Sequence, residues 1–331
     1  MKDKGRFFFE GNAMKKPAKA SGNLTNTLAN YVSGVITMSL QFIKDVCRGS
    51  RPSFYSAYHK TFEVARAETE EQAEEVFRLR YQVYCKENGF IKPDMTRYEL
   101  ERDIYDRHAL HTLLMHRPSG RAVGTARVVL PRHDKPLRSF PLQSVCDHPL
   151  LYDEERLQNV CEISRFCMTK AFRKRDGDGS LLPAYNEADW EKPPQKDQQL
   201  VYFRRMIPYA PLGLIMGAFE LALDAEIADC FCVFDETQLD AMRRIGLEYE
   251  TLGAPIEFFG RQQPVLMNIR HVLETMKINN EPCWDIVSDY GRLDAKAEKL
   301  HRKLENLQRR KKKPEPLESA GPKEEAVSAA G

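Results

Sequence analysis

The chain has 331 residues, of which 42% are hydrophobic and 10% aromatic, and its formal net charge at pH 7 is +2. This length and composition predict a globular protein with one large domain or two small ones, each able to bury an ordinary core. A charge balance so close to zero excludes a protein whose bulk charge is adapted to nucleic acid, so no nucleic-acid partner is expected.

Eight cysteines are scattered along the chain without a CxxC pair, which favours reduced thiols over a disulfide framework. The sequence shows no signal peptide at its start and no uninterrupted apolar run of the roughly 20 residues that a membrane-spanning helix needs. We therefore expect a cytoplasmic protein.

The first 60 residues form an extension that is basic and polar except for the segment 31–43. The apolar positions of this segment predict an amphipathic helix, which can lie over the core of the protein or touch a membrane surface. Peripheral contact with the inner membrane therefore stays open.

The main domain is predicted to span 61–275 and to begin with a short alternating strand from Thr61. A helix over 70–88 follows, with apolar residues at helical spacing. Two apolar runs within 108–131 are separated by Pro118, Ser119 and Gly120, which predicts a β-hairpin.

A further strand is predicted over 159–170, followed by an inserted loop at 173–200 that is rich in Gly, Pro and charge. Residues 212–227 read as a buried helix and 229–234 as a short buried strand. Asp235 and Gln238 then form a capping box for a helix that ends at Gly246. This alternation predicts α/β layering with some parallel pairing.

Within the inserted loop, Asp176 and Asp178 approach the spacing of a calcium loop, but Leu181 stands where the turn needs glycine. No metal site is therefore expected. The region 276–331 is predicted to be an amphipathic helix and a disordered tail. The helix carries about two heptads of apolar residues, so packing on the body and self-association both stay open.

Four groups of charged residues stand out among the predicted elements. They are Arg80, the acidic set Glu101, Asp103 and Asp106, the strand residue Arg127, and the pair Glu162 and Arg165. Taken singly, each has a structural explanation: a lone arginine can extend its charge to water, an acidic turn is usually solvated, and a buried ion pair can simply fix geometry. A separation of three places Glu162 and Arg165 on opposite faces of a regular strand, so they should not pair unless the strand is bulged.

Taken together, the groups form an ordered series of motifs: R-x-x-V-Y from Arg80, E-x-D-x-x-D from Glu101, V-G-T-A-R ending at Arg127, and E-I-S-R-F from Glu162. This series resembles the acyl-homoserine-lactone synthase family, which has the fold of the GNAT N-acyltransferases. The form LRYQVYCKENGF and the segment 253–269 look most like acyltransferases associated with PEP-CTERM/exosortase gene systems, relatives of long-chain N-acyl amino acid synthases. The resemblance covers roughly residues 61–269 and implies an α/β, GNAT-like fold with a mixed central sheet flanked by helices.

The resemblance implies transfer of an acyl group from acyl carrier protein or coenzyme A to a small-molecule amine, with no tightly bound cofactor. Its catalytic residues would be Glu162, Arg165 and Arg127, with Glu162 as the base that deprotonates the amine and Arg165 on the opposite side or at the acyl-donor edge. Its substrate-binding residues would be Arg80, Tyr84, Phe90, Glu101, Asp103 and Asp106. Homoserine-lactone synthases usually have tryptophan at the position of Phe90, which disfavours S-adenosylmethionine as the amine here.

In such folds two neighbouring parallel strands diverge and admit the pantetheine arm of the donor, and 162–169 and 229–234 are the candidates. The helix over 212–223 is apolar enough to line an acyl pocket, although a core helix explains it equally. An acidic carrier protein would need a basic surface, which could be built from Arg173, Lys174, Arg175, Arg204 and Arg205. A solvated charge run explains those five residues equally well.

Two alternatives stay open at this point. One is an acyl-homoserine-lactone synthase that uses S-adenosylmethionine. The other is a module without catalytic activity that binds an acyl thioester or acyl carrier protein. The complete set of acidic and basic positions favours an enzyme.

Overall fold

The computed structural model describes residues 54–92, 98–172 and 205–311. Contacts divide the chain into two units, 1–51 and 52–331, and all described residues lie in the second. The predicted helix at 31–43 and the predicted loop at 173–200 lie outside the described residues. The helices of the described part are α2 (Phe54–Thr61), α3 (Glu70–Tyr81), α4 (Glu154–Leu157), α6 (Pro211–Asp224), α7 (Glu236–Arg244), α8 (Ile269–Asn279), α9 (Glu281–Val287) and α10 (Arg292–Lys311).

The strands are β1 (Phe62–Arg66), β2 (Ala109–His116), β3 (Arg121–Val129), β4 (Val160–Met168), β5 (Asp229–Phe234), β6 (Glu250–Thr251), β7 (Ile256–Glu257) and β8 (Arg261–Asn268). Shorter helical segments are a π-helix at Gln82–Glu87 and 3-10 turns at Ile104–His108, Pro136–Arg138, Pro141–Ser144, Pro149–Leu151, Lys170–Phe172 and Ile207–Tyr209. The predicted hairpin, the helices beginning near residues 70, 212 and 236, and the strand 229–234 are confirmed. The helix from residue 70 changes from α to π geometry after Tyr81.

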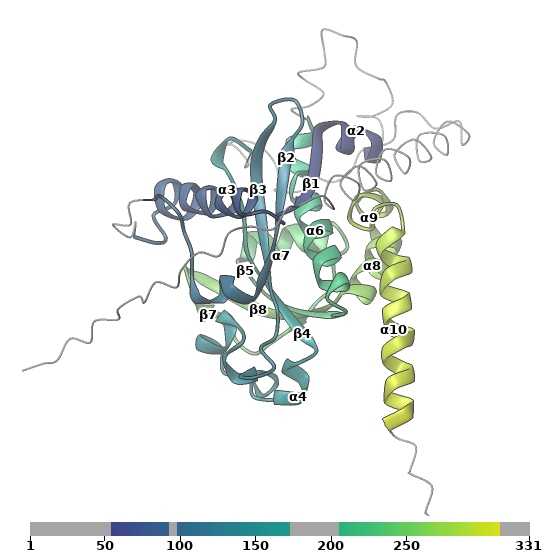
Figure 1. The fold of residues 1–331 in the computed structure, drawn as a ribbon. Helices are drawn as coiled ribbons and strands as arrows, with labels where there is room; N and C mark the ends of the chain where they lie inside the picture. Colours follow the sequence, from purple (N-terminus) through teal and green to yellow (C-terminus); the bar gives the residue numbers. More distant parts are fainter. Residues whose placement is uncertain (1–53, 93–97, 173–204, 312–331) are drawn as a thin grey trace, which may run out of the picture. The chain divides into compact units, whose positions relative to one another are not determined.

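The eight strands form a mixed sheet in the order β1-β2-β3-β4-β5-β8-β6, with β7 paired to β8 (Figure 1). Each neighbouring pair is antiparallel except β4 and β5, which are parallel. Their ladder contains three pairs and ends where Glu162 lies opposite Phe231. Beyond that point β4 continues to Met168 and β5 to Phe234 without pairing to each other, so the prediction that these strands are parallel and diverge is confirmed.

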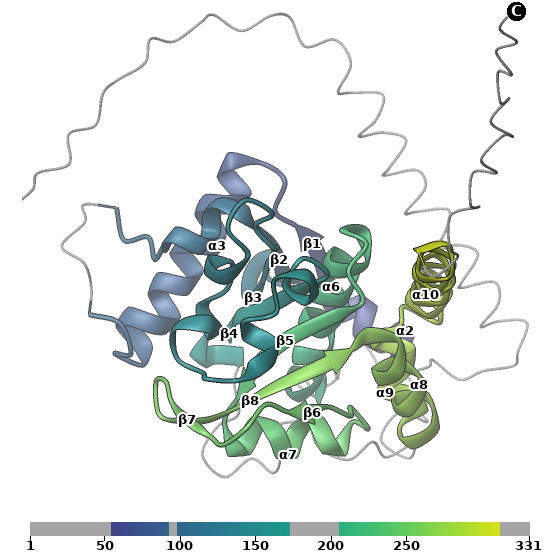
Figure 2. The ribbon, with the colours of Figure 1, turned by 90° about the horizontal axis from the view of Figure 1, so that it is seen from below.

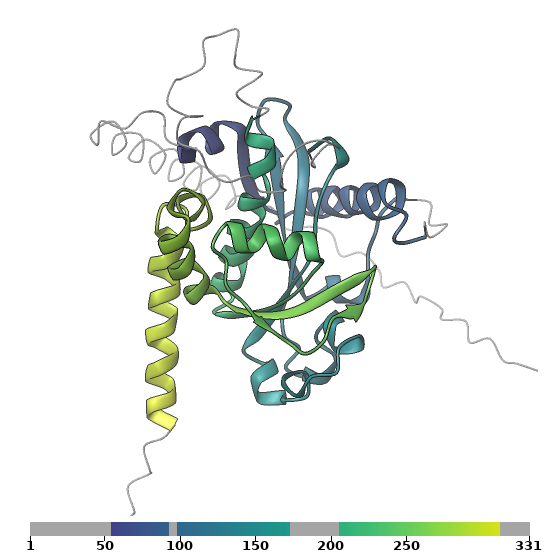
Figure 3. The same cartoon turned by 180° about the vertical axis from the view of Figure 1, so that it is seen from behind.

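Helix α6 packs closely on one face of the sheet. A Cβ added at Gly213 would overlap Tyr58 Oη, and one added at Gly217 would lie 2.5 Å from Thr112 Oγ1, so only glycine allows this approach. The Tyr58 hydroxyl fills the contact, because it accepts a hydrogen bond from Gly213 N–H and donates one to the Ala210 carbonyl. Helices α7, α8, α9 and α10 contribute to the same core, and Figure 3 shows the group formed by α8, α9 and α10 from behind.

Helix α3 packs against strands β2 and β3 on the other face. Leu113 of β2 contacts Val76 and Phe77 of α3, whereas the adjacent Leu114 belongs to the core under α6, because successive strand residues point to opposite faces. Farther along this second face, a smaller apolar cluster forms around Phe140, Leu142 and Phe231. The polar residues predicted from the sequence lie between α3 and this cluster.

Helix α10 begins on the body and continues past it (Figure 1). Leu293, Ala297 and Leu300 are buried, whereas 46% of Leu307 is exposed. Of the two alternatives for this helix, packing on the body is therefore observed for its first half.

Candidate active site

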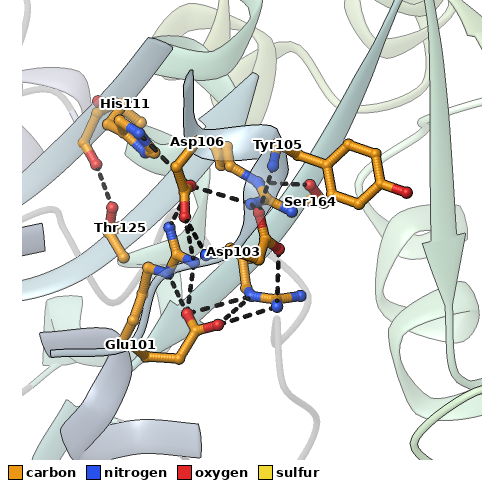
Figure 4. A network of polar contacts seen from close by, with 11 residues as sticks. Glu101, Asp103, Tyr105, Asp106, His111, Thr125 and Ser164 are labelled. Atoms are coloured by element: carbon orange, nitrogen blue, oxygen red, sulfur yellow. Dashed lines mark hydrogen bonds and ion pairs between the residues drawn. The ribbon is translucent and has the colours of Figure 1, made fainter. Parts of the chain in front are cut away.

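The acidic motif forms a short capped turn. Asp103 caps the 3-10 helix Ile104–His108, because its Oδ1 accepts a hydrogen bond from Tyr105 N–H at 2.9 Å. Asp106 Oδ2 in turn accepts one from Asp103 N–H at 2.8 Å. Glu101 N–H donates to the Phe77 carbonyl of α3. These local bonds fix three carboxylates within six residues, all directed toward the sheet (Figure 4).

Three arginines from three different elements meet these carboxylates. Arg80 comes from α3, Arg127 from β3 and Arg165 from β4. The side chains of Arg80 and Arg127 are fully buried, and that of Arg165 is 12% exposed. The expectation that Arg80 taken alone could extend its charge to water is therefore wrong.

The six charged groups form one closed ring in which the charges alternate, and we call it the charge ring. Arg80 binds Glu101 at 2.5 Å, Glu101 binds Arg165 at 3.0 Å, and Arg165 binds Asp103 at 3.1 Å. Asp103 binds Arg127 at 2.6 Å, Arg127 binds Asp106 at 3.0 Å, and Asp106 binds Arg80 at 2.7 Å. Every member therefore has two partners of opposite charge, which is how buried charges are tolerated.

The ring shifts the ionisation of its members in the direction that keeps it charged. Burial alone would raise the pKa of Asp106, but the hydrogen bond and charge of Arg80, together with the charge of Arg127, lower that pKa well below its usual range. Burial opposes the charge of Arg80, yet Glu101 and Asp106 raise its pKa overall. Asp106 and Arg80 are consequently both held in their charged forms at neutral pH.

A bulge in β4 brings Arg165 into the ring. Thr125 pairs with Cys167 and Arg127 with Ser164, so β4 uses one more residue than β3 between these pairs. Arg165 lies at this irregularity with a φ of 51°, a left-handed conformation that is uncommon for residues other than glycine. Arg165 therefore reaches the same carboxylates as Arg127. The bulge is the stated exception to the expectation that Glu162 and Arg165 lie on opposite faces, which holds only for a regular strand.

Glu162 lies beside the ring but outside it. Its side chain is 2% exposed, and its Oε2 accepts a hydrogen bond from Leu142 N–H at 2.9 Å. Burial raises the pKa of Glu162 to about 7, although this hydrogen bond and the charges of Arg127 and Arg165 oppose the shift. A carboxyl group with this pKa can hold or release a proton near neutral pH.

Glu162 also marks the point where two strands of the sheet separate. It occupies the last paired position of β4 before this strand separates from β5. The carboxyl group therefore lies at the closed end of the gap between the two strands.

Tyr84 lies in the π-helix Gln82–Glu87, and Phe90 lies in the segment that follows it. The Tyr84 ring lies under the guanidinium group of Arg165, 5.4 Å from its centroid, and packs with Leu79, Val83 and Cys167. Phe90 is half exposed and its N–H donates to the Tyr84 carbonyl. Tyr84 thus contacts a ring member, whereas Phe90 lies toward the surface.

Three further groups at the site were not singled out from the sequence. Ser164 Oγ accepts a hydrogen bond from Arg127 Nε at 3.1 Å, and strand alternation from Glu162 could have indicated it. His111 pairs with Arg127 across β2 and β3; burial, followed by the charge of Arg80, lowers its pKa to about 4, so it is neutral. The Leu142 N–H comes from the short 3-10 turn Pro141–Ser144, for which no element was predicted from the sequence.

The proposed carrier-protein surface lies largely outside the described residues. Of its five cations only Arg205 is described, and it is exposed. Helix α6, the candidate lining of an acyl pocket, is buried in the core along nearly its whole length. The one described segment long and apolar enough to cross a membrane, Ile207–Asp224, contains this helix and is 78% buried. Within the described ranges, no group of three or more His, Cys, Asp or Glu side chains is arranged to hold a metal ion.

A comparison with protein families matches the part of the chain that contains these site residues. A family model described as an acetyltransferase (GNAT) domain matches residues 79–182, a span that includes Glu162 and every member of the charge ring. Among curated proteins, none matches this sequence.

Three solved structures are similar in fold to this chain. TofI, in a ternary complex with an inhibitor and MTA, is 20% identical and covers 67% of this chain and 100% of its own, with a TM-score of 0.44. BjaI, a CoA-dependent acyl-homoserine lactone synthase, is 17% identical over 70% of this chain and 98% of its own, with a TM-score of 0.43. FeeM, an N-acyl amino acid synthase from uncultured soil microbes, is 10% identical over 65% of this chain and 95% of its own, with a TM-score of 0.38.

The matched domain and the mixed sheet with one diverging parallel pair define the class of this protein. It has a GNAT-like α/β fold and is an acyltransferase.

Proposed function

We propose that this protein is an N-acyltransferase that moves a long-chain acyl group from a thioester to the amine of an amino acid or a similar small metabolite. The observation that carries the proposal is Glu162, a buried carboxyl group with a pKa of about 7 at the closed end of the β4–β5 gap. An amine arrives as an ammonium ion at neutral pH and must lose a proton before it can attack a carbonyl carbon. Glu162 would accept that proton directly or through a water molecule.

The reaction forms a C–N bond and breaks the C–S bond of the thioester, which leaves an amide and a thiol. The donor would lie along the part of β4 that has no partner in β5, where the pantetheine arm can bind free backbone groups. A backbone N–H between Arg165 and Cys167 would stabilise the negative charge that develops on the carbonyl oxygen. The amine nitrogen loses a second proton as the C–S bond breaks, so that of the two protons one ends on the leaving thiolate and the other is released to solvent.

The charge ring would position the acceptor. Arg80 is saturated by Glu101 and Asp106, so its role is to hold the acidic turn in place. Asp103 is the most exposed carboxylate of the ring, at 24%, and is the best placed to contact an ammonium ion. One nitrogen of Arg127, Nη2, is buried and has no hydrogen-bond partner among the described residues, so it could bind an oxygen of the acceptor.

The donor would be acyl carrier protein or coenzyme A carrying the acyl group. The resemblance of Gly253–Ile269 to acyltransferases of PEP-CTERM/exosortase systems favours a long chain. The cations Arg173, Lys174, Arg175, Arg204 and Arg205 remain the proposed dock for a carrier protein.

The test is transfer from acyl thioesters to separate amines, followed by mass spectrometry of the lipid products. We expect N-acyl amides from the wild type and a loss of about 10²- to 10⁴-fold in kcat for Glu162→Gln. Glu154→Gln, at an exposed position on α4, is the matched control and should keep full activity. A lactone product made from S-adenosylmethionine would replace this proposal with a homoserine-lactone synthase. Donor binding without transfer to any amine would indicate a binding module.

A further inference from the structure

We propose that Phe259, in the turn between β7 and β8, forms with Phe90 an aromatic clamp that binds the aliphatic chain of the acyl donor at the open end of the β4–β5 gap. The identity of the donor rests on the proposed function. The clamp itself is defined by two exposed rings that approach each other from distant parts of the chain.

The two rings contact each other and together present one half-exposed apolar surface, across which an aliphatic chain can lie. Phe90 is 50% exposed and Phe259 is 40% exposed, and their ring centroids are 6.0 Å apart with an interplanar angle of 37°. Phe258 extends the apolar surface, because its ring centroid is 4.7 Å from that of Phe259. Aromatic rings left half in water gain free energy when an apolar chain covers them.

Phe90 belongs to the β4 side of the gap. Its N–H donates to the Tyr84 carbonyl at 2.9 Å, and Tyr84 packs with Cys167 in the unpaired half of β4. The guanidinium group of Arg165, also in that half, lies over the Tyr84 ring.

Phe259 belongs to the β5 side. Strand β8 pairs with β5 up to Phe234 opposite Gln263, and β7 and β8 then form the hairpin that carries Phe258 and Phe259. The hairpin extends beyond the last residue of β5, and Figure 2 shows it projecting past the edge of the sheet toward the end of the helix that follows α3. The contact between Phe90 and Phe259 therefore joins the two walls of the gap.

The backbone at Phe259 is held in an unusual conformation. Its φ is 54°, and that of Gly260 is 101°. A left-handed conformation is unfavourable for a bulky residue such as phenylalanine, and such strain concentrates where a side chain must be presented in one direction. Glycine at 259 would relieve it, yet this position carries a large exposed ring.

The chemistry of the clamp assigns Phe90 to the donor, whereas the resemblance to homoserine-lactone synthases implies a position near the amine. An acceptor with an ammonium group is matched by the carboxyl groups of Asp103 and Glu162, whereas Phe90 and Phe259 offer an apolar surface. The aliphatic chain of the donor is the part of either substrate that gains from such a surface. The clamp would thus select donors by chain length.

Binding of S-alkyl pantetheine thioethers, which resemble the donor but cannot transfer a group, tests the clamp by calorimetry on the full chain. In the wild type we expect affinity to rise about fourfold for each methylene group that the clamp covers. Phe259→Ala should lower the ratio of tetradecyl to butyl affinity about tenfold and leave butyl affinity unchanged. Ile278→Ala, at an exposed position on α8, is the control and should not change the ratio.

An unchanged ratio in Phe259→Ala, or wild-type affinity that is independent of chain length, overturns the clamp. Thermal unfolding of each variant shows whether the fold is kept, and the more conservative Phe259→Leu should retain most of the discrimination. Amide formation is measured separately. Chain-length-dependent binding without transfer to any amine would contradict the proposed function and leave the clamp supported.

Discussion

Each charge of the ring has two partners, so a single residue cannot be removed without consequences for two others. Arg80 illustrates this best, because it is fully buried and binds both Glu101 and Asp106. When one member of a buried ion network is deleted, the remaining charges stay buried without compensation.

Arg80→Met should therefore destabilise the fold by about 3–5 kcal/mol, measured as the free energy of unfolding in urea. Arg78→Met in the same helix is the matched control, because Arg78 is 63% exposed and its ion pair among the described residues is with Glu74 at 3.7 Å. That variant should change the free energy of unfolding by less than about 1 kcal/mol. Equal effects of the two substitutions would show that the ring does not contribute as described.

Glu162 predicts two opposite pH dependences. The proposed base must be ionised, so kcat should rise as pH increases through about 7 and then level off. The free energy of unfolding should instead fall as pH increases. The pKa of Glu162 is raised in the folded state, so the folded protein keeps a proton that the unfolded chain releases near pH 4.5. The stabilising contribution of this proton is therefore full below pH 4.5 and is lost as pH rises to about 7.

Glu162→Gln should remove both effects. Its residual activity should lack the rise near pH 7, and its free energy of unfolding should lack the decrease between those two pH values. Parallel pH series of kcat and of urea unfolding for the two proteins check this. A rise near pH 7 that persists in the variant would assign the titration to another group.

At the scale of elements, the contact between α6 and the sheet depends on glycine. In an unobstructed helix Gly→Ala stabilises by about 1 kcal/mol. Gly217→Ala should instead destabilise, by about 1–3 kcal/mol, because the added Cβ would lie 2.5 Å from Thr112 Oγ1 and 2.8 Å from a methyl group of Val64. The free energy of unfolding of Gly217→Ala in urea tests this prediction. A stabilised variant would mean that the contact between α6 and the sheet is looser than the structure shows.

The elements also show how far sequence reasoning reaches. Local signals predicted the hairpin from its turn residues and the α7 start from Asp235 and Gln238. The diverging strands were predicted only through the resemblance to GNAT N-acyltransferases. The bulge at Arg165 could not be predicted, because it depends on the pairing of β4 with β3. Strand alternation alone placed Arg165 on the wrong face, and the Leu142 N–H that binds Glu162 comes from a segment without periodicity.

The motif residues themselves were predictable as a set, but their closure into a ring was not. Sequence spacing gives no distance between α3, β3 and β4, which are brought together only by the folded sheet. The contact between Phe90 and Phe259 is of the same kind, since it joins residues far apart in the chain.

For the stability of the whole molecule, the first half of α10 should matter more than the second. Removal of residues 305–331 should leave the unfolding temperature nearly unchanged, because Leu293, Ala297 and Leu300 would remain in the core. Removal from residue 292 onward should lower it strongly, since it exposes the surface of α6 and α8 that these side chains cover. Thermal unfolding of the two truncated chains compares them directly, and equal stabilities would contradict this division.

The balance of charge in the ring governs what an incoming acceptor meets. Three guanidinium and three carboxylate groups cancel, so the ring presents a wall with no net charge, and Glu162 beside it supplies the charge that changes near neutral pH. With Glu162 protonated, the wall offers an ammonium ion little overall attraction; with Glu162 ionised, it offers one full negative charge. Under the proposed function, capture of the acceptor and its activation would be coupled to a single proton equilibrium, because the form of Glu162 that can accept the proton is also the form that attracts the ammonium ion.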